Sequence, residues 1–384
     1  MPKEINIGVI ITHGPLKGGG GVQRRFARAF NYLTSKNSPL NCYLIGHSGL
    51  LKRLEESSIR INKKNVILVS ELDMVEKKIK SNFFLKNILI SIRLSVALIK
   101  VVKDIKLNIV HFLNANHLLI PFLIWLKIKK VKIVLSMVAS PPWDEVFESS
   151  LKKKIVWNIF FKFSDVIDSL YRSFGNIYSQ YSNKIRVTPC SFTDYNQFYP
   201  HNKEKLIVFA GRFESRKNPI LFIDSIIGIQ DEIRKYGWKC LMLGCGELEG
   251  MLRNKVKKAK IYDILTITSL WDISEVLNKS LIFVSLQKGE NYPSQSLLEA
   301  MASGNTIIAT DVGDTRRLIN DENGFLLTTH DPLELSQIIS YLIKKPKLCS
   351  ILGRNARQYV LSHHRLEIMS EYLKNLWLDV AKKY

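Results

Sequence analysis

Two basic side chains stand in a loop between an expected strand and an expected helix near the middle of the chain. The apolar run Leu206–Ala210 predicts the strand, and Pro219 suits the first turn of the helix. Arg212 and Lys217 lie between them. A guanidinium binds phosphate oxygens with a planar fork and an ammonium binds them as a point charge, so the pair suits a diphosphate. The alternative is an ordinary basic loop in solvent.

A second candidate site lies in a segment that begins as a loop and continues as a helix. It reads GENYPSQSLLEAMASG over residues 289–304 and follows the apolar run Leu281–Ser285. Ser294 is expected to cap the helix, and Gly304 to end it. Glu299 falls mid-helix among apolar neighbours, where a carboxylate needs donors such as the two hydroxyls of a ribose. The alternative is a glutamate on the solvent face.

A run of glycines near the N-terminus is the third candidate. Gly18–Gly21 follow the β-branched run Ile5–Ile11 and precede helical spacing over Val22–Leu33. Glycines let backbone N–H groups approach a ligand closely, and a helix N-terminus favours anions. The run is too dense for a GxGxxG dinucleotide site. We interpret it as a loop that touches a phosphate or a sugar, with a flexible loop as the alternative.

The elements that position these residues form two series of short apolar runs alternating with helices. The strands expected in the first series are Ile5–Ile11, Cys42–Ile45, Val66–Val69, Ile109–Leu113, Ile133–Met137 and Val166–Leu170. The second series predicts the strands Leu206–Ala210, Cys240–Leu243, Leu265–Thr268, Leu281–Ser285 and Thr306–Thr310, and the helices Pro219–Lys235, Glu247–Ala259, Ser294–Ala302 and Pro332–Ile343. This alternation is typical of parallel sheets covered on both faces, so we predict an α/β chain with two sheets facing each other across a cleft.

The alternation breaks over residues 186–204, which hold two prolines and no period. We predict an N-terminal domain over 1–190 and a C-terminal domain over 191–364. We predict a final amphipathic helix over 365–384. It packs either on the C-terminal domain or, by crossing back, on the N-terminal domain.

The composition fits a globular protein with a basic surface. Of its 384 residues 46% are hydrophobic and 23% charged, which excludes a disordered or collagen-like chain. A net charge of +22 attracts nucleic acid, anionic lipid or phosphorylated substrates. The five scattered cysteines form no metal-binding pattern, and no signal peptide or long uncharged stretch occurs, so we expect a cytoplasmic protein.

Taken together, the candidate segments resemble the retaining glycosyltransferases of family 4, whose GT-B fold consists of two Rossmann-like domains. The resemblance runs in order through the Gly-rich loop, FAGRFESRKNP, LMLGCGELEG, GENYPSQSLLEAMASGNTIIATDVGD and NGFLL. It implies transfer of a sugar from a nucleotide-diphosphate sugar to a glycan acceptor with retained configuration, without a metal or other cofactor. Bacterial cell-surface polysaccharide or lipopolysaccharide synthesis is the expected setting.

The resemblance also implies roles for individual residues. Arg212 and Lys217 match the diphosphate-binding cations and Glu299 the ribose-binding glutamate, and the expected catalytic residues are Arg212, Lys217 and Glu290. The other expected donor-binding residues are Gly19, Gly20, Gly21, Asn291, Tyr292, Pro293, Ser294, Gln295 and Ser296. Catalysis is then mainly electrostatic, because these cations and a helix N-terminus stabilise the leaving diphosphate.

Two positions depart from the family pattern. The family has two glutamates with seven residues between them, whereas eight lie between Glu290 and Glu299, and Asn291 stands at the usual spacing. Either Glu290 reaches the sugar through a one-residue bulge, or Asn291 takes its place. Val138 stands where the family often carries a histidine. The alternatives for that contact are Asp144, Glu145, His111 and His117, with a structural role as the other interpretation of the histidines.

Residues 83–103 predict a basic amphipathic helix. Lys86, Arg93 and Lys100 recur every seven residues and share one face, while the rest is almost entirely apolar. Such a helix suits a membrane interface, and the alternative is a surface helix that covers the first sheet. We therefore expect a glycan or lipid-linked glycan acceptor near an anionic membrane surface. The protein is expected in the cytoplasm or on the inner face of the cytoplasmic membrane as a peripheral protein.

Two other classes of function compete with this interpretation. One is a non-catalytic basic α/β protein that binds membrane or nucleic acid, and the other is an NAD-dependent oxidoreductase. RNA-binding signatures and GxGxxG are absent from the sequence. We therefore expect no nucleic acid partner and no nicotinamide cofactor.

Overall fold

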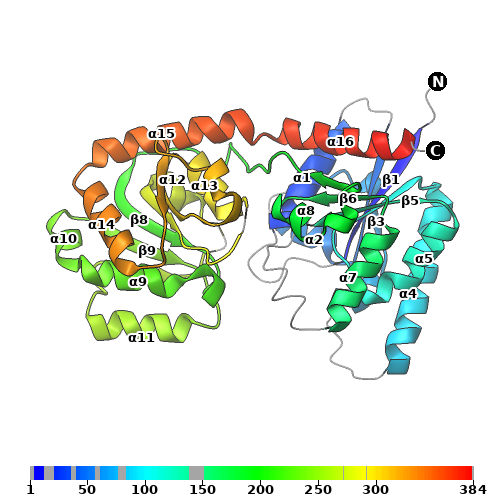
Figure 1. The fold of residues 1–384 in the computed structure, drawn as a ribbon, viewed down its shortest axis with the longest axis horizontal. Coiled ribbons are helices and arrows are strands. Elements are labelled where there is room, and N and C mark those ends of the chain that lie inside the picture. The colour runs from blue at the N-terminus through cyan, green and yellow to red at the C-terminus, as the bar shows by residue number, and fades with distance from the viewer. Residues whose placement is uncertain are drawn as a thin grey trace. The chain divides into compact units, whose positions relative to one another are not determined.

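The computed structural model describes residues 4–12, 21–35, 40–56, 61–76, 84–137, 151–270, 272–290 and 292–382. The chain forms two compact units: unit 1 comprises residues 1–191 and 366–384, and unit 2 comprises residues 192–365. Each unit holds one parallel sheet flanked by helices (Figure 1). The α/β class predicted from the alternation of runs is confirmed.

Unit 1 contains a seven-stranded sheet in the order β3-β2-β1-β4-β5-β6-β7. Its strands are β1 (Ile5–Ile11), β2 (Leu40–Gly46), β3 (Val66–Leu68), β4 (Ile109–Phe112), β5 (Lys132–Met137), β6 (Val166–Ser169) and β7 (Ile185–Val187). Ile7 of β1 is in register with Cys42 of β2 on one side and with Ile109 of β4 on the other. The order reverses between β1 and β4, so right-handed crossovers on the two sides of this point lie on opposite faces of the sheet.

The helices of unit 1 follow this division. They are α1 (Gly21–Ser35), α2 (Leu50–Glu56), α3 (Leu72–Glu76), α4 (Phe84–Ile105), α5 (Ile120–Ile128), α7 (Leu151–Phe163), α8 (Ser173–Ile177) and α16 (Leu366–Lys382). On one face α1 and α16 pack on each other, and α16 also packs on β4. Elsewhere α4 packs on α5 and α5 on α7, while α5 and α7 contact β5 (Figure 1). Among the residues described in this structure, no helix has the length and apolar character to cross a membrane.

Unit 2 contains a six-stranded sheet in the order β10-β9-β8-β11-β12-β13. Its strands are β8 (Glu204–Ala210), β9 (Lys239–Leu243), β10 (Leu265–Thr268), β11 (Ser280–Ser285), β12 (Thr306–Thr310) and β13 (Gly324–Leu327). Its helices are α9 (Pro219–Gly228), α10 (Gln230–Lys235), α11 (Glu249–Ala259), α12 (Ser274–Lys279), α13 (Gln295–Ala302), α14 (Pro332–Ile343) and α15 (Pro346–His363). Helix α9 packs on α11 and α14, and α13 packs on α12 and α15.

Two expected segments of the fold are corrected by the structure, and a further segment forms a strand that was not expected. The helix predicted over Pro219–Lys235 is two helices, because Ile229 after Gly228 leaves the helical conformation with φ −127° and is buried in the core. The expected connection over 186–204 begins inside β7. Four-residue β13 was not predicted as a strand, although its backbone pairs in parallel with β12.

Candidate functional site

The cations and carboxylates predicted in unit 2 come together at one edge of its sheet. Strands β8 and β11 are parallel neighbours, with Phe209 in register with Val284, and the strand order reverses between them. The loop after β8 carries Arg212 and Lys217, and the loop after β11 carries Glu290. Ligands of open α/β sheets bind at such a reversal, beyond the carboxyl ends of the strands.

The loop after β8 is fixed by close contact with the loop after β9. The Gly211 N–H donates to the Leu243 carbonyl at 3.0 Å. A Cβ on Gly244 would lie 2.0 Å from the Gly211 carbonyl oxygen, so any larger residue would force the two loops apart. This contact explains the first glycine of LMLGCGELEG, and it holds the backbone that carries Arg212.

The loop after β8 holds three cations and one carboxylate, and two of the cations pair with it. Glu214 pairs with Arg212 across 3.6 Å and with Arg216 across 3.1 Å. In the part of the chain that the structure describes, the Lys217 ammonium has no carboxylate within ion-pair distance. The loop is tied to the next one by a hydrogen bond of 3.0 Å from the Lys288 N–H to the Arg216 carbonyl. It therefore carries excess positive charge beside the loop of Glu290.

The environment of Lys217 disfavours the charged form of its ammonium group. Its aliphatic stem covers the end of β8, since a Cβ on Gly211 would lie 3.9 Å from its Cδ. Burial, and next the charge of Arg216, lower the pKa of Lys217 to about 7, although Glu214 acts in the opposite direction. Arg212 differs, because 69% of its side chain is exposed. An anion bound here would restore the full charge of Lys217 and meet an accessible guanidinium.

The buried carboxylate predicted in the following helix is present. Glu299 lies in α13 and is only 6% exposed, so the alternative of a glutamate on the solvent face is wrong. The Gln295 Nε2 donates to Glu299 Oε1 at 3.2 Å. One turn earlier, the Ser296 hydroxyl donates to the Ala210 carbonyl at 3.3 Å. The start of α13 is thus next to the end of β8.

Ser294 occupies the capping position but does not cap the helix as predicted. It precedes α13 in an extended conformation, and its hydroxyl makes no hydrogen bond to a first-turn amide. Instead its Oγ lies 3.2 Å from the Ser296 Oγ. The first-turn amides of α13 are therefore not covered by this side chain.

Glu290 lies against the loop after β12. Gly313 has a φ of +52°, and a Cβ there would lie 2.4 Å from the Glu290 Cγ. Asn291, the alternative to Glu290, lies outside the described residues, as do Gly19, Gly20, Val138, Asp144 and Glu145. Gly21 is the first residue of α1 in unit 1.

Tyr292 and Pro293, between Glu290 and α13, are both buried. The Arg317 guanidinium carbon lies 4.4 Å from the centroid of the Tyr292 ring, and Arg317 pairs with Asp314 across 3.0 Å. Sequence reasoning missed Arg317 and Gly313. The available signal was the segment DVGDTRR directly after a predicted strand. These two residues support the segment that carries the predicted donor contacts.

In unit 1, His111 has a structural environment. It is fully buried, its Nδ1 accepts a hydrogen bond of 3.2 Å from the Trp377 indole, and its Nε2 lies 2.7 Å from the Ser136 Oγ. Burial lowers the pKa of His111 to about 3, so it is neutral. His117 is largely exposed, and the partial burial of its ring, followed by the charge of Lys152, lowers its pKa.

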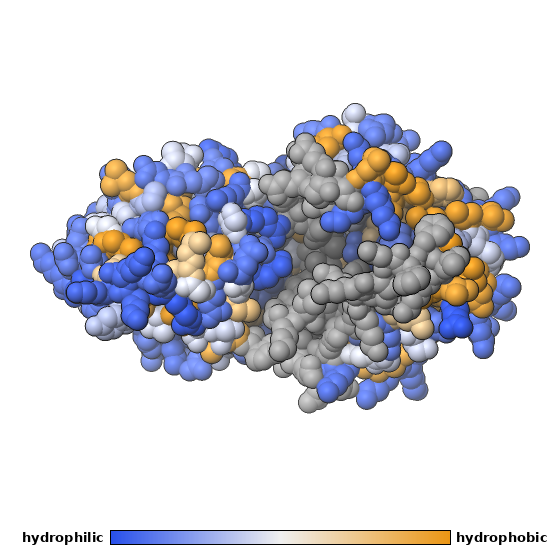
Figure 2. All heavy atoms as spheres, turned by 90° about the horizontal axis from the view of Figure 1, so that it is seen from below, coloured by the Kyte–Doolittle hydropathy of each residue, from blue (hydrophilic) through white to orange (hydrophobic). Residues whose placement is uncertain are grey.

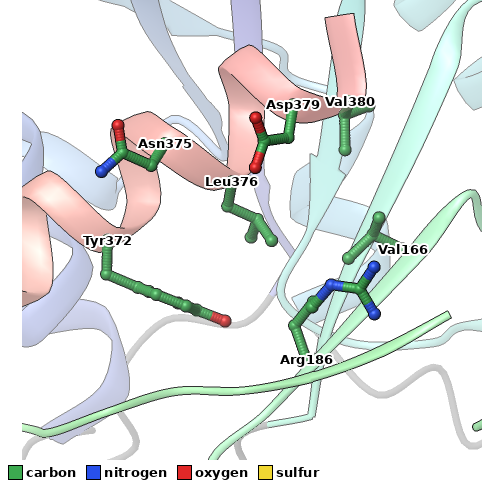
Figure 3. A pocket seen from close by; sticks show the side chains of 7 residues that line it. All are labelled: Val166, Arg186, Tyr372, Asn375, Leu376, Asp379 and Val380. Atoms are coloured by element: carbon green, nitrogen blue, oxygen red, sulfur yellow. The ribbon is translucent and has the colours of Figure 1, made fainter. Parts of the chain in front are cut away.

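A cavity of about 360 Å³ lies in unit 1 beside α16 (Figure 3). It is lined by Val166, Arg186, Tyr372, Asn375, Leu376, Asp379 and Val380. The Arg186 guanidinium donates to the carbonyls of Asn183 and Ile185 at 3.2 and 2.9 Å. None of the predicted donor residues lines this cavity.

Part of the sequence matches a known family model. Residues 192–359 match the model described as Glycosyl transferases group 1. A Campylobacter jejuni enzyme, GalNAc-alpha-(1->4)-GalNAc-alpha-(1->3)-diNAcBac-PP-undecaprenol alpha-1,4-N-acetyl-D-galactosaminyltransferase, is 23% identical over 235 residues, which are 59% of this chain and 65% of that enzyme. The lipopolysaccharide core biosynthesis mannosyltransferase LpsB of Rhizobium meliloti is 25% identical over 183 residues, 44% of this chain and 51% of LpsB. The chain thus spans less than two thirds of the length of either curated relative.

Solved structures resemble the chain over nearly its whole length. Anabaena HepE in complex with UDP has a TM-score of 0.74 at 13% identity, over 98% of this chain and 100% of HepE. A glycosyltransferase from Rickettsia africae has a TM-score of 0.73 at 16% identity, over 99% of this chain and 100% of that one. These likenesses establish the GT-B fold, and residues 192–359 are similar to the glycosyl transferases group 1 family.

Proposed function

We propose that this protein is a retaining glycosyltransferase that moves a sugar from a nucleotide-diphosphate sugar to a glycan acceptor. The observation that carries the proposal is the cationic loop beside a buried carboxylate at the reversal between β8 and β11. Arg212 and Lys217 suit a diphosphate, and Glu299 suits the hydroxyls of a ribose. The cations of the protein therefore fit the diphosphate of a nucleoside diphosphate, and the carboxylate fits its ribose.

The chemistry in this proposal is mainly electrostatic. Breakage of the bond between the sugar and the diphosphate develops negative charge on phosphate oxygens. Arg212, Lys217 and the first turn of α13 would stabilise that charge, and their fixed positions lower the cost of reorganisation. The acceptor hydroxyl attacks the anomeric carbon from the face that the diphosphate leaves, and a phosphate oxygen takes its proton. Glu290 is the candidate that contacts the donor sugar.

The acceptor in this proposal is a glycan or lipid-linked glycan of bacterial cell-surface polysaccharide or lipopolysaccharide synthesis. The Campylobacter relative carries a PP-undecaprenol-linked glycan in its name, and LpsB is named for lipopolysaccharide core biosynthesis. Such an acceptor is held at a membrane. We therefore propose a peripheral protein on the inner, anionic face of the cytoplasmic membrane.

A panel of nucleoside diphosphates tests the donor site. Thermal unfolding is measured with each diphosphate and with its nucleoside, which lacks the phosphates that Arg212 and Lys217 would hold. A diphosphate at about a hundred times its Kd should add about 2.7 kcal/mol of stability, and the nucleoside much less. The sugar nucleotides of the best base are then tested for hydrolysis, with the anomer of the released sugar followed by NMR. No stabilisation by any diphosphate would overturn the proposed donor site, and release of the inverted anomer would overturn retention.

A further inference from the structure

The outward face of α4 in unit 1 carries large apolar side chains. One apolar stripe of this helix, with Leu94 and Leu98, is buried. A second stripe holds Leu89, Ile92 and Val96, whose exposed fractions are 59%, 51% and 62%. The helix therefore has more apolar surface than its packing in unit 1 covers.

The two neighbouring helices extend this apolar face. Helix α5 packs on α4 and exposes Ile124, and α7 packs on α5 and exposes Leu151 and Ile155. We refer to six exposed side chains as the apolar patch: Leu89, Ile92, Val96, Ile124, Leu151 and Ile155. Hydrophobic side chains, drawn in orange, gather at the right of the view in Figure 2.

The turn at residues 117–119 connects the two ends of the apolar patch. The Ser91 hydroxyl on α4 donates to the Leu118 carbonyl at 2.8 Å. Lys152, in the first turn of α7, is near enough to His117 for its charge to act on that ring. The first half of α4 and the start of α7 are thus on the same part of unit 1.

Cations are interleaved with the apolar patch. Arg93 lies between Ile92 and Val96 along α4, and three exposed lysines, Lys152–Lys154, lie between Leu151 and Ile155 along α7. Helices α4, α5 and α7 together contain nine basic residues and one acidic residue, Asp104. Exposed apolar side chains flanked by basic side chains are typical of helices that lie in the interface of an anionic membrane.

We propose that the apolar patch inserts into the headgroup region of an anionic bilayer, with the surrounding cations on lipid phosphates. This inference rests on the proposed function, because it assumes that the glycan acceptor is held at a lipid surface. Anionic headgroups compensate the cations, and the acyl boundary covers the apolar side chains. A second copy of the chain fits less well, because a symmetric contact would bring two sets of the same cations together.

One member of the apolar patch, Leu151, lies near the edge of the unit 1 sheet at which ligands of such sheets bind. Helix α7 ends at Phe163, and β6 begins at Val166, so the end of α7 is at the amino edge of the strands. Leu151, at the other end of this helix, is therefore near the carboxyl edge, which is the ligand-binding edge of such sheets. Insertion of Leu151 would bring a lipid-borne acceptor to that edge.

Vesicle flotation tests insertion on the full-length protein without donor or acceptor. The vesicles contain phosphatidylcholine alone or mixed with phosphatidylglycerol. Wild-type protein should float with the anionic vesicles at low salt, and part of it should remain bound at about 1 M salt, where the Debye length is about 3 Å. The apolar variant Ile92→Gln/Val96→Gln/Leu151→Gln should lose the salt-resistant fraction. The matched control Leu333→Gln, at a residue 61% exposed in unit 2, should float as wild type does.

A charge variant separates the two contributions. Lys152→Gln/Lys153→Gln/Lys154→Gln should weaken low-salt binding by about a hundredfold, because each lysine near an anionic surface contributes about fivefold. Flotation of the apolar variant indistinguishable from that of wild type at both salt concentrations would overturn insertion. If wild-type protein forms dimers and the apolar variant does not, the apolar patch is a self-association surface, and this result would also overturn insertion. Nucleoside diphosphate binding, measured on the same samples without vesicles, reports the proposed function separately.

Discussion

The indole N–H of Trp377 donates a hydrogen bond to Nδ1 of His111 across 3.2 Å, joining the last helix to the fourth strand of unit 1. An indole nitrogen only donates, so the imidazole proton is on Nε2 and is donated to the Ser136 hydroxyl at 2.7 Å. Ser136 in turn donates to Asp168 Oδ2 at 2.7 Å. The hydroxyls of Thr188 and Tyr372 donate to the other oxygen of Asp168, each at 2.7 Å. A buried carboxylate is thus fully hydrogen-bonded, and two of the residues in this network come from α16.

Replacement of Trp377 should destabilise unit 1. Trp377→Phe keeps a ring against His111 but leaves a buried acceptor without its donor, which costs about 1–3 kcal/mol. Trp125→Phe is the matched control, because Trp125 stacks on Phe122 at 6.4 Å and a phenyl ring keeps that contact. Denaturant unfolding followed by circular dichroism measures both. Equal losses in the two variants would contradict a specific role for the Trp377 hydrogen bond.

Acid should weaken the fold through His111. Burial holds the pKa of His111 at about 3, whereas an unfolded histidine titrates near its ordinary value of 6.5. Below that value the unfolded chain binds a proton that the folded chain does not. Stability should therefore be highest above the ordinary pKa and fall by about 1.4 kcal/mol per pH unit as the pH drops towards the folded pKa. His111→Gln should have lower stability at neutral pH and a shallower decline, and an unchanged decline would rule out His111 as its source.

Arg212 should matter for the diphosphate and not for the nucleoside. Arg212→Ala removes an exposed guanidinium from the cationic loop, and loss of one charge-assisted contact costs about 1.5–3 kcal/mol. Calorimetry with a nucleoside diphosphate and with its nucleoside measures the difference. Arg253→Ala is the control, because Arg253 is also exposed and paired, to Glu249 on α11. Wild-type affinity of Arg212→Ala for the diphosphate would remove Arg212 from the site.

Glu299→Gln should weaken donor binding through the ribose while the fold survives. The amide is close in size to the carboxylate and can still accept from Gln295. The test compares the affinities of wild-type protein and of Glu299→Gln for two nucleoside diphosphates, one with the complete ribose and one that lacks a ribose hydroxyl. Wild-type protein should prefer the complete ribose, and the variant should lose most of that preference, with the KM for the donor raised. An undiminished preference in the variant would refute the assignment of Glu299.

Diphosphate affinity should fall as the pH rises above about 7. Free Lys217 has a pKa of about 7, and a bound diphosphate, being negative, raises it. In the window between the free and bound pKa values, binding takes up a proton, so affinity is highest at the low end of the window and declines towards alkaline pH. Lys217→Arg, which stays charged, should bind with little pH dependence above neutrality. An equal decline in this variant would assign the pH dependence to another group.

Local sequence signals were sufficient for most strands and for the positions of the loops that carry charge. Strands β1, β10 and β12 and helix α14 have the bounds that their apolar runs predict. β-Branched runs between glycine and proline loops determine such elements within a few residues of the chain. The position of the loop containing Arg212 and Lys217 therefore followed from the order of the residues, and the resemblance to a family supported its role.

Tertiary packing decided what each apolar or polar residue does. The periodicity of α4 shows apolar residues on more than one side, and only its contacts with α5 and the turn at 117–119 decide that Leu94 is buried and Val96 exposed. The pairing of Trp377 with His111 joins residues 266 positions apart, a distance at which no local pattern operates. The burial of Glu299 depends on the same long-range packing, because α13 is covered by α12 and α15. Local propensity acts over one turn or one strand, whereas burial is a property of surfaces that meet only after the chain has folded.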